Sequence, residues 1–223
     1  MSIYGKIETM NKYDLILYDL DGTIWDSIPL IMKCFKLAYL DVFGQCDRSD
    51  EDLKSYIGRP LPDTFAMHDA KTSEALLQAY LAHNSVLLEN DEIPLFDGVI
   101  SELRKIRDLG IPQGFVTSKR TLSAGITLRL KGLDNFFDVG ICKEDTENHK
   151  PLPDPIITAA KRVQITDMSR VIYIGDALVD AICAKNACVD FALVEWSQMD
   201  KEKIIAAAPS GSRIISRFSE VLN

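Results

Sequence analysis

Leu15-Ile16-Leu17-Tyr18-Asp19-Leu20-Asp21-Gly22-Thr23 is the stretch that decides the fold of this chain. A run of Leu, Ile and Tyr ends in two carboxylates, one residue apart, that are followed by Gly-Thr. Such a run between polar residues predicts a strand that is buried on both faces. Because side chains alternate along a strand, Asp19 and Asp21 would lie on the same side at its carboxyl end. Two carboxylates so close are unfavourable unless a cation or a shared proton compensates them.

Two interpretations of this carboxylate pair are open. Ligands of open parallel sheets bind at the carboxyl ends of the strands, which favours a functional site. Asp and Gly are also common turn residues, so an ordinary β-turn would explain the same residues. The choice depends on what the rest of the chain places beside the pair.

The composition is that of a globular protein without nucleic-acid or membrane partners. The chain has 223 residues, 47% of them hydrophobic and 26% charged, which suits a core domain with a smaller insertion or one large domain. The formal net charge of −8 disfavours nucleic acid and anionic membranes, because an acidic surface repels both. An anionic small substrate would need a local cluster of cations or a metal ion.

The cysteines give neither a disulfide framework nor a zinc motif. Their number is odd, their spacing is irregular, and no C-x-x-C occurs among Cys34, Cys46, Cys142, Cys183 and Cys188. No apolar stretch approaches the length of a membrane span, and the N-terminus lacks the pattern of a signal peptide. We therefore expect a cytoplasmic protein.

A helical block follows the first strand. Asp26 or Ser27 can cap a helix that has Pro29 in its first turn and ends at Gly44. Further helices are expected at 50–56, 61–68 and 73–89, and no segment between residues 26 and 93 shows the alternation typical of strands. The expected organisation is an α/β core, residues 1–24 and 95–223, interrupted by an all-helical insertion, residues 25–94.

Strands and helices alternate after this block. The pattern predicts strands at 113–117, 137–141 and 170–174, with weaker candidates at 191–194 and 212–215. Helices are predicted at 99–109, 121–130, 153–163 and 177–186. Alternation of this kind predicts an α/β fold with a doubly wound parallel sheet and right-handed crossovers.

Polar residues suited to one reaction stand at four strand ends or loops: Asp19 with Asp21, Thr117 with Ser118, Lys150, and Asp176 with Asp180. The carboxyl ends of parallel strands open onto one crevice, so these groups can converge. Each also has a structural explanation: a cap for the next helix, a solvated loop lysine, or acids that favour a helix N-terminus. All four together favour a common site.

The chemistry of this set is that of phosphate hydrolysis. Three carboxylates, Asp19, Asp21 and Asp176, without a His or Cys cluster suit Mg²⁺. Mg²⁺ with a cationic lysine neutralises a phosphate, and a carboxylate nucleophile can form an acyl-phosphate. A second carboxyl can protonate the leaving alcohol and then deprotonate the attacking water.

These residues resemble the phosphatase branch of the haloacid dehalogenase-like (HAD) superfamily over nearly the whole chain. The four family motifs are matched, in order, by Asp19-Leu20-Asp21-Gly22-Thr23, Val116-Thr117-Ser118-Lys119, Lys150-Pro151 and Gly175-Asp176-Ala177-Leu178-Val179-Asp180. The helical block is similar to the C1 type of cap found in this family. Residues 23–27, 57–61, 117–120 and 150–155 look most like phosphoglycolate phosphatases and the related pyrophosphatases.

The resemblance implies a role for each matching residue. Asp19 would be the nucleophile, and Asp21 the general acid–base whose main-chain carbonyl also reaches Mg²⁺. Asp176 would complete the Mg²⁺ site, with Asp180 holding its surroundings in place. Thr117 would bind a phosphate oxygen, and Lys150 would neutralise the nucleophile and the phosphate. The candidates for substrate contact are Gly22, Arg59, Ser118 and Lys119.

The sequence also separates this chain from other members of the superfamily. A dehalogenase would not need Asp21, and Arg59 cannot replace the cap lysine that forms a Schiff base in phosphonate-cleaving relatives. Sugar-phosphate mutases carry a cap histidine soon after the first motif. Ile31 stands near that place here, so mutase activity is disfavoured. One departure from the family pattern is Ala187-Cys188, where Ala-Gly is common, and it leaves the geometry of that loop open.

We therefore expect a Mg²⁺-dependent phosphatase of small phosphorylated metabolites, with phosphoglycolate-like substrates preferred. Alternatives within the superfamily are a pyrophosphatase, a 5′-nucleotidase and a sugar-phosphate phosphatase. An alternative of another class is an inactive phosphate-sensing or scaffold protein on the same fold. A monomer or weak homodimer is expected, in which the connections near Trp25 and Pro94 let the helical block close over the site.

Overall fold

The computed structural model describes residues 11–57, 61–90 and 93–222. Its sheet has six parallel strands in the order β3-β2-β1-β4-β5-β6. The strands are β1 (Leu15–Tyr18), β2 (Gln113–Val116), β3 (Val139–Ile141), β4 (Val171–Gly175), β5 (Asp190–Val194) and β6 (Arg213–Ile215). The two weaker strand candidates are thus strands, and the predicted doubly wound α/β fold is confirmed.

The position of β1 in this sheet creates the place for a site. β1 pairs with β2 on one side and with β4 on the other. From β1 the chain adds β2 and β3 outward in one direction, and then returns to add β4, β5 and β6 in the other. The strand order therefore reverses beside β1, and such a switch point leaves a crevice at the carboxyl ends of the strands.

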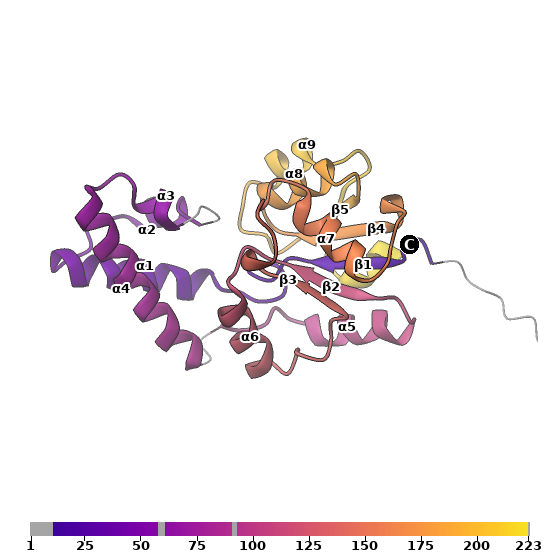
Figure 1. Cartoon of the computed structure of the whole chain (residues 1–223), viewed down its shortest axis with the longest axis horizontal. Coiled ribbons are helices and arrows are strands. Elements are labelled where there is room, and N and C mark those ends of the chain that lie inside the picture. Colours follow the sequence, from indigo (N-terminus) through magenta and orange to yellow (C-terminus); the bar gives the residue numbers. More distant parts are fainter. Residues whose placement is uncertain (1–10, 58–60, 91–92, 223) are drawn as a thin grey trace, which may run out of the picture.

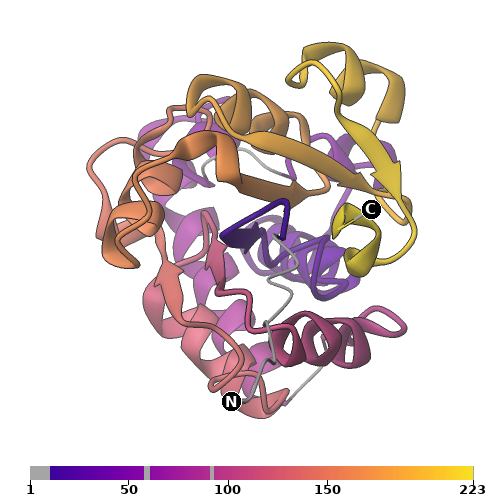
Figure 2. The same cartoon turned by 90° about the vertical axis from the view of Figure 1, so that its right-hand side faces the viewer.

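Alternating residues of the strands build two apolar cores, one on each face of the sheet. Ile16 and Tyr18 belong to the core under α5 (Val99–Asp108) and α6 (Thr121–Leu130). Leu15 and Leu17 belong to the other core, which is covered by α7 (Asp154–Arg162), α8 (Leu178–Asn186) and α9 (Lys201–Ala207). Figure 2 shows these two helical layers on opposite sides of the sheet. Burial on both faces explains the unbroken apolar run of β1.

The helical block lies to one side of the sheet, beyond the carboxyl end of β1 (Figure 1). It consists of α1 (Ile28–Phe43), α2 (Asp50–Lys54), α3 (Leu61–Phe65) and α4 (Ala70–Glu89), and none of its described residues forms a strand. Its interior is aromatic, with ring centroids 4.9 to 6.5 Å apart among Phe35, Tyr56, Phe65 and Tyr80.

Most element ends lie within a few residues of their predicted places. The largest shifts are at α3, which is shorter than expected, and at α4, which begins three residues earlier than predicted. The early start has a local cause, because the Asp69 carboxylate accepts hydrogen bonds from the main-chain N–H groups of Lys71 and Thr72. Short 3₁₀ turns complete the chain at η1 (Lys143–Asp145), η2 (Met168–Arg170) and η3 (Phe218–Leu222). No helix of the described residues has the length and apolarity of a membrane span.

The turn after α8 keeps a glycine-like geometry without a glycine. Cys188 has a φ of 56°, in the left-handed region. Its N–H donates to the carbonyl of Lys185 at 3.2 Å, and the N–H of Val189 donates to the carbonyl of Ala184 at 3.1 Å. Helices commonly end with a left-handed residue of this kind, usually glycine. The geometry of this loop, which the sequence did not decide, is therefore the usual helix-ending turn. Because Cys188 has a side chain, the turn strains the backbone at that residue.

We predict that Cys188→Gly raises the free energy of unfolding by about 1 kcal/mol, because glycine adopts this φ without the Cβ clash. Urea denaturation of the purified variants would measure the change. Cys188→Ala is the control, since it removes the thiol but keeps a Cβ in the same conformation. Equal gains for the two variants would show that the thiol, and not the backbone, limits stability.

Candidate active site

Three of the predicted site residues follow directly on three adjacent strands. Asp19 follows β1, Thr117 follows β2 and Asp176 follows β4. All three side chains are buried although each is polar. The structure therefore brings these groups to the same edge of the sheet, beside the switch point.

Lys150 is the buried cation of this edge. Its side chain is only 4% exposed, and its Nζ lies 2.7 Å from Asp180 Oδ1, 3.0 Å from Asp19 Oδ1 and 3.1 Å from the hydroxyl of Tyr173. Burial alone would lower the pKa of Lys150, but the charges of Asp180 and Asp19 outweigh it and raise the pKa above its ordinary value. Lys150 is thus a fixed ammonium between two carboxylates, and not a solvated loop lysine.

Asp180 supports this arrangement from the first turn of α8. Its Oδ2 accepts hydrogen bonds from the main-chain N–H groups of Asp176 at 3.3 Å and Ala177 at 3.0 Å, while Oδ1 accepts from Lys150. Oxygen atoms of Asp180, Asp19 and Asp176 lie within 4.8 Å of one another, as metal ligands would. Both oxygens of Asp180 are already engaged inside the protein, so Asp19 and Asp176 offer the more accessible oxygens for a ligand.

The charges of Asp19 and Asp176 are not fully compensated. Burial, opposed by Lys150 and reinforced by Asp180, raises the pKa of Asp19 to about 7. Burial, and then the neighbouring carboxylates of Asp180 and Asp19, raise the pKa of Asp176 well above its ordinary value. Among the described residues, Asp19 Oδ1 meets Lys150 Nζ at 3.0 Å and has no further polar partner. This buried oxygen therefore has a lone pair left that can bind a ligand.

A hard divalent cation fits these donors. Carboxylate oxygens are the ligands that Mg²⁺ prefers, and a cation between Asp19 and Asp176 would remove the repulsion that raises their pKa values. Gly22 permits the close packing around them, since a Cβ at this position would lie 2.2 Å from Asp176 Oδ2. Gly22 also has a φ of 82°, which side chains rarely adopt. Its place beside Asp176 explains why glycine stands there.

Asp21 has different neighbours from Asp19. Lys119 Nζ lies 3.1 Å from Oδ1 and 3.3 Å from Oδ2 of Asp21, and the indole N–H of Trp25 donates to Oδ1 at 2.7 Å. Burial by itself would raise the pKa of Asp21, but Lys119 and Trp25 outweigh it and hold the pKa below its ordinary value. The two aspartates of one short motif therefore have different surroundings, and in the metal-free fold Asp21 is the more easily ionised of the two.

The remaining candidates are placed less specifically. Thr117 Oγ1 accepts the N–H of Lys119 at 3.2 Å, and Ser118 is exposed. Neither caps α6, because the carboxylate of Glu144 accepts the N–H and the hydroxyl of Thr121 at the start of that helix. Arg59 lies outside the described residues.

Two residues that the sequence analysis did not select hold the site together. The hydroxyl of Tyr173 donates to the carbonyl of Val116 at 2.8 Å and accepts a hydrogen bond from Lys150. The hydroxyl of Ser197 donates to the carbonyl of Asp176 at 2.6 Å. Tyr173 lies inside an apolar strand and Ser197 lies 21 residues beyond its partner, so no local pattern marks either.

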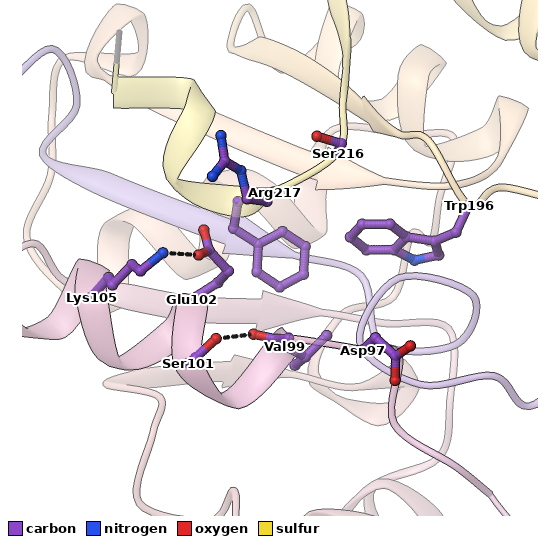
Figure 3. Close-up of a pocket in the computed structure, with 10 residues that line it drawn as sticks. Asp97, Val99, Ser101, Glu102, Lys105, Trp196, Ser216 and Arg217 are labelled. Atoms are coloured by element: carbon purple, nitrogen blue, oxygen red, sulfur yellow. Dashed lines mark hydrogen bonds and ion pairs between the residues drawn. The ribbon is translucent and has the colours of Figure 1, made fainter.

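A hollow of about 250 Å³ lies between the start of α5, η3 and the segment after β5 (Figure 3). The rings of Trp196 and Phe218 form its apolar side, with centroids 5.7 Å apart. Glu102 and Lys105 form an ion pair beside them, drawn as a dashed line in Figure 3. Of the residues described, its lining includes none of the strand-end groups above, so it is separate from the candidate active site.

Known proteins resemble this chain over almost its full length. The model of the haloacid dehalogenase-like hydrolase family matches residues 16–194. Pyrophosphatase PpaX of Bacillus velezensis is 30% identical over 216 residues, which are 96% of this chain and 97% of that protein.

Solved structures share the fold. A predicted phosphatase from Clostridium acetobutylicum has a TM-score of 0.77 at 25% identity, covering 91% of this chain and 94% of that one. A predicted phosphoglycolate phosphatase from Haemophilus somnus has a TM-score of 0.82 at 19% identity, covering 96% of this chain and 98% of that one. At this lower identity the likeness concerns the fold alone.

We predict that Lys150→Met lowers the free energy of unfolding by about 3–5 kcal/mol at neutral pH, because it leaves buried carboxylates without their cation. Chemical denaturation followed by circular dichroism would measure this loss. Lys143→Met, which replaces an exposed lysine, is the control and is expected to change stability by less than about 0.5 kcal/mol. A similar result for both variants would contradict the compensating role of Lys150.

Proposed function

Because the chain belongs to the haloacid dehalogenase-like hydrolases and is a phosphatase of that family, we propose that Asp19 carries the phosphoryl group during catalysis. One observation carries this proposal: Asp19 is buried at the switch point with its Oδ1 only 3.0 Å from the ammonium of Lys150. A carboxylate in this position can attack phosphorus while the adjacent cation balances the charge of the phosphate.

In the first half of the reaction Asp19 attacks phosphorus, and the bond from phosphorus to the leaving oxygen breaks. Asp21, protonated when the negative charge of the bound substrate raises its pKa, gives a proton to that oxygen. In the second half Asp21 takes a proton from water, whose oxygen attacks phosphorus and releases Asp19 as a carboxylate. Lys150 stays charged throughout, and Thr117 is proposed to hold a phosphate oxygen.

The proposed metal is Mg²⁺, held by the carboxylates of Asp19 and Asp176 and by the main-chain carbonyl of Asp21. When bound, it supplies charge neutralisation for the phosphate and for the two acids. The support for it is the oxygen-only donor set and the raised pKa values of Asp19 and Asp176. Asp180, already engaged with Lys150 and α8, is proposed to keep Asp176 in position.

Two substrate classes are proposed for this site. The motif resemblance favours phosphoglycolate-like esters, whereas the name of the Bacillus velezensis relative favours inorganic pyrophosphate. Both carry a second negative charge beside the phosphoryl group that is transferred. Lys119, whose side chain is 11% exposed next to Asp21, is a cation that could meet that charge. Residues 25–94 are proposed to act as a cap over this substrate, with Gly22, Ser118 and Arg59 as further contacts.

We predict that Asp19→Asn lowers phosphate release by more than about 10³-fold, since an amide cannot form the acyl-phosphate. The measurement is kcat/KM for 2-phosphoglycolate, pyrophosphate, a 5′-nucleotide and a sugar phosphate, with Mg²⁺ and with EDTA. Asp134→Asn, at an exposed aspartate, is the control. Activity that survives both EDTA and Asp19→Asn would refute the mechanism, and wild-type inactivity on every substrate would favour a phosphate sensor.

We predict that Mg²⁺ stabilises the protein more strongly as the pH rises towards about 7. The pKa of Asp19 is raised from 3.8 to about 7 by folding, so ionisation of Asp19 weakens the metal-free fold across this range. Mg²⁺ binds the ionised form and removes that loss. Thermal unfolding with and without Mg²⁺, below and above this range, would measure it, and an equal stabilisation at all pH values would contradict the assignment.

A further inference from the structure

Trp25 connects the general acid–base to the junction between the sheet and the helical block. Its side chain is fully buried, and its indole N–H donates to Asp21 Oδ1 at 2.7 Å. Its main-chain carbonyl accepts the N–H of Gly22 at 2.9 Å, so Trp25 is tied to the motif by both backbone and side chain.

The junction itself is a short two-stranded ribbon. The N–H of Asp26 donates to the carbonyl of Pro94 at 2.9 Å, and the N–H of Phe96 donates to the carbonyl of Ile24 at 3.2 Å. Trp25 lies opposite Leu95 in an antiparallel bridge at the centre of this ribbon. Because the two connections to the helical block are bonded to each other here, a movement of one also moves the other.

A second indole braces the ribbon from the core. Trp196 donates its indole N–H to the carbonyl of Thr23 at 3.2 Å and packs against the ring of Phe96 with centroids 5.4 Å apart. It is bonded to the same segment as Trp25, but through a main-chain carbonyl, and among the described residues its hydrogen bond and ring contacts go to Thr23, Phe96 and Phe218. Trp196 therefore provides a matched comparison for Trp25.

The two carboxylate oxygens of Asp21 have different hydrogen-bond partners. Oδ1 accepts from the indole of Trp25 and from Lys119, which uses both of its lone pairs. Oδ2 has the longer contact with Lys119, at 3.3 Å, and none with the indole, so it is the oxygen more accessible to a proton. The indole is rigid and buried, whereas the lysine has a flexible stem, so the indole defines the orientation of the carboxyl group.

We propose that Trp25 is the positioning residue of the general acid–base: its indole N–H holds Oδ1 of Asp21 so that Oδ2 faces the reacting oxygen. This inference rests on the proposed function, in which Asp21 gives a proton to the leaving group. It also makes the orientation of Asp21 depend on the ribbon that carries the helical block.

Trp25→Phe tests this role, because phenylalanine keeps an aromatic ring but has no N–H. Two substrates separate positioning from stability: 2-phosphoglycolate has a poor leaving group that needs the proton, whereas p-nitrophenyl phosphate has a good one that does not. The parameter is kcat/KM with Mg²⁺, because it reports the steps up to departure of the leaving group.

The expected result is a loss of about 10- to 100-fold for 2-phosphoglycolate, the effect of one hydrogen bond to a charged group. For p-nitrophenyl phosphate the loss is expected to stay within about threefold, because general acid catalysis contributes little there. Trp196→Phe is expected to change both substrates equally and by no more than about threefold. An equal loss on both substrates in Trp25→Phe, no loss on either, or a selective loss in Trp196→Phe would overturn the proposal.

A second measurement does not depend on the folding of Trp25→Phe. The chain has two tryptophans, so its NMR spectrum has two indole N–H signals. Asp21→Asn is expected to shift the signal of Trp25 and to leave that of Trp196 in place, and two unmoved signals would overturn the proposal. Hydrolysis that survives Asp19→Asn would instead refute the proposed function, whatever the indole signals show.

Discussion

The buried contact of Lys150 with the carboxylates of Asp19 and Asp180 is the interaction on which the rest of this site depends. Three buried acids, Asp19, Asp176 and Asp180, meet here with one ammonium. When all three acids are ionised, the difference is two negative charges, which is the charge that a divalent cation would balance. Without Lys150 the excess would be larger, and burial would favour protonation of the acids over their use as nucleophile and ligand.

The strand order explains how this charge arrangement is built. β1 and β4 are neighbours although their sequences lie far apart, and this places Asp19 beside Asp176. Asp180, one turn into α8, binds Lys150 through one oxygen and the start of its own helix through the other. The helix therefore fixes the position of the Asp180 side chain, and Asp180 in turn fixes the position of the Lys150 ammonium. Asp21 leaves this group because the chain turns after it towards the helical block, where Lys119 and Trp25 meet it.

The junction with the helical block also serves both the fold and the site. A ribbon formed by residues 24–26 and 94–96 joins the two parts, and Trp25 at its centre contacts Asp21 directly. The apolar core on that face of the sheet continues through Trp25 and Ile28 into the interior of the block around Phe35. A change in the angle between the sheet and the helical block would therefore move Trp25, the residue of the ribbon that also contacts Asp21. This offers a physical link between closure of a cap and readiness for proton transfer.

The amino-acid sequence by itself determined most elements of this protein, though not α9, and the convergence of its main polar groups. The apolar run before Asp19, the alternation after residue 95 and the absence of strand patterns in the helical block are local signals, and parallel strands open at a common edge. Only the tertiary structure decided which residues support that edge. The contacts of Tyr173 and Ser197 join groups through strand order, which leaves no spacing in the sequence. Trp25 lies only four residues after Asp21, but the turn between them decides that its indole reaches the carboxylate. The left-handed Cys188 is similar, because the closing hydrogen bonds of α8 and the following strand impose a conformation that its residue type disfavours.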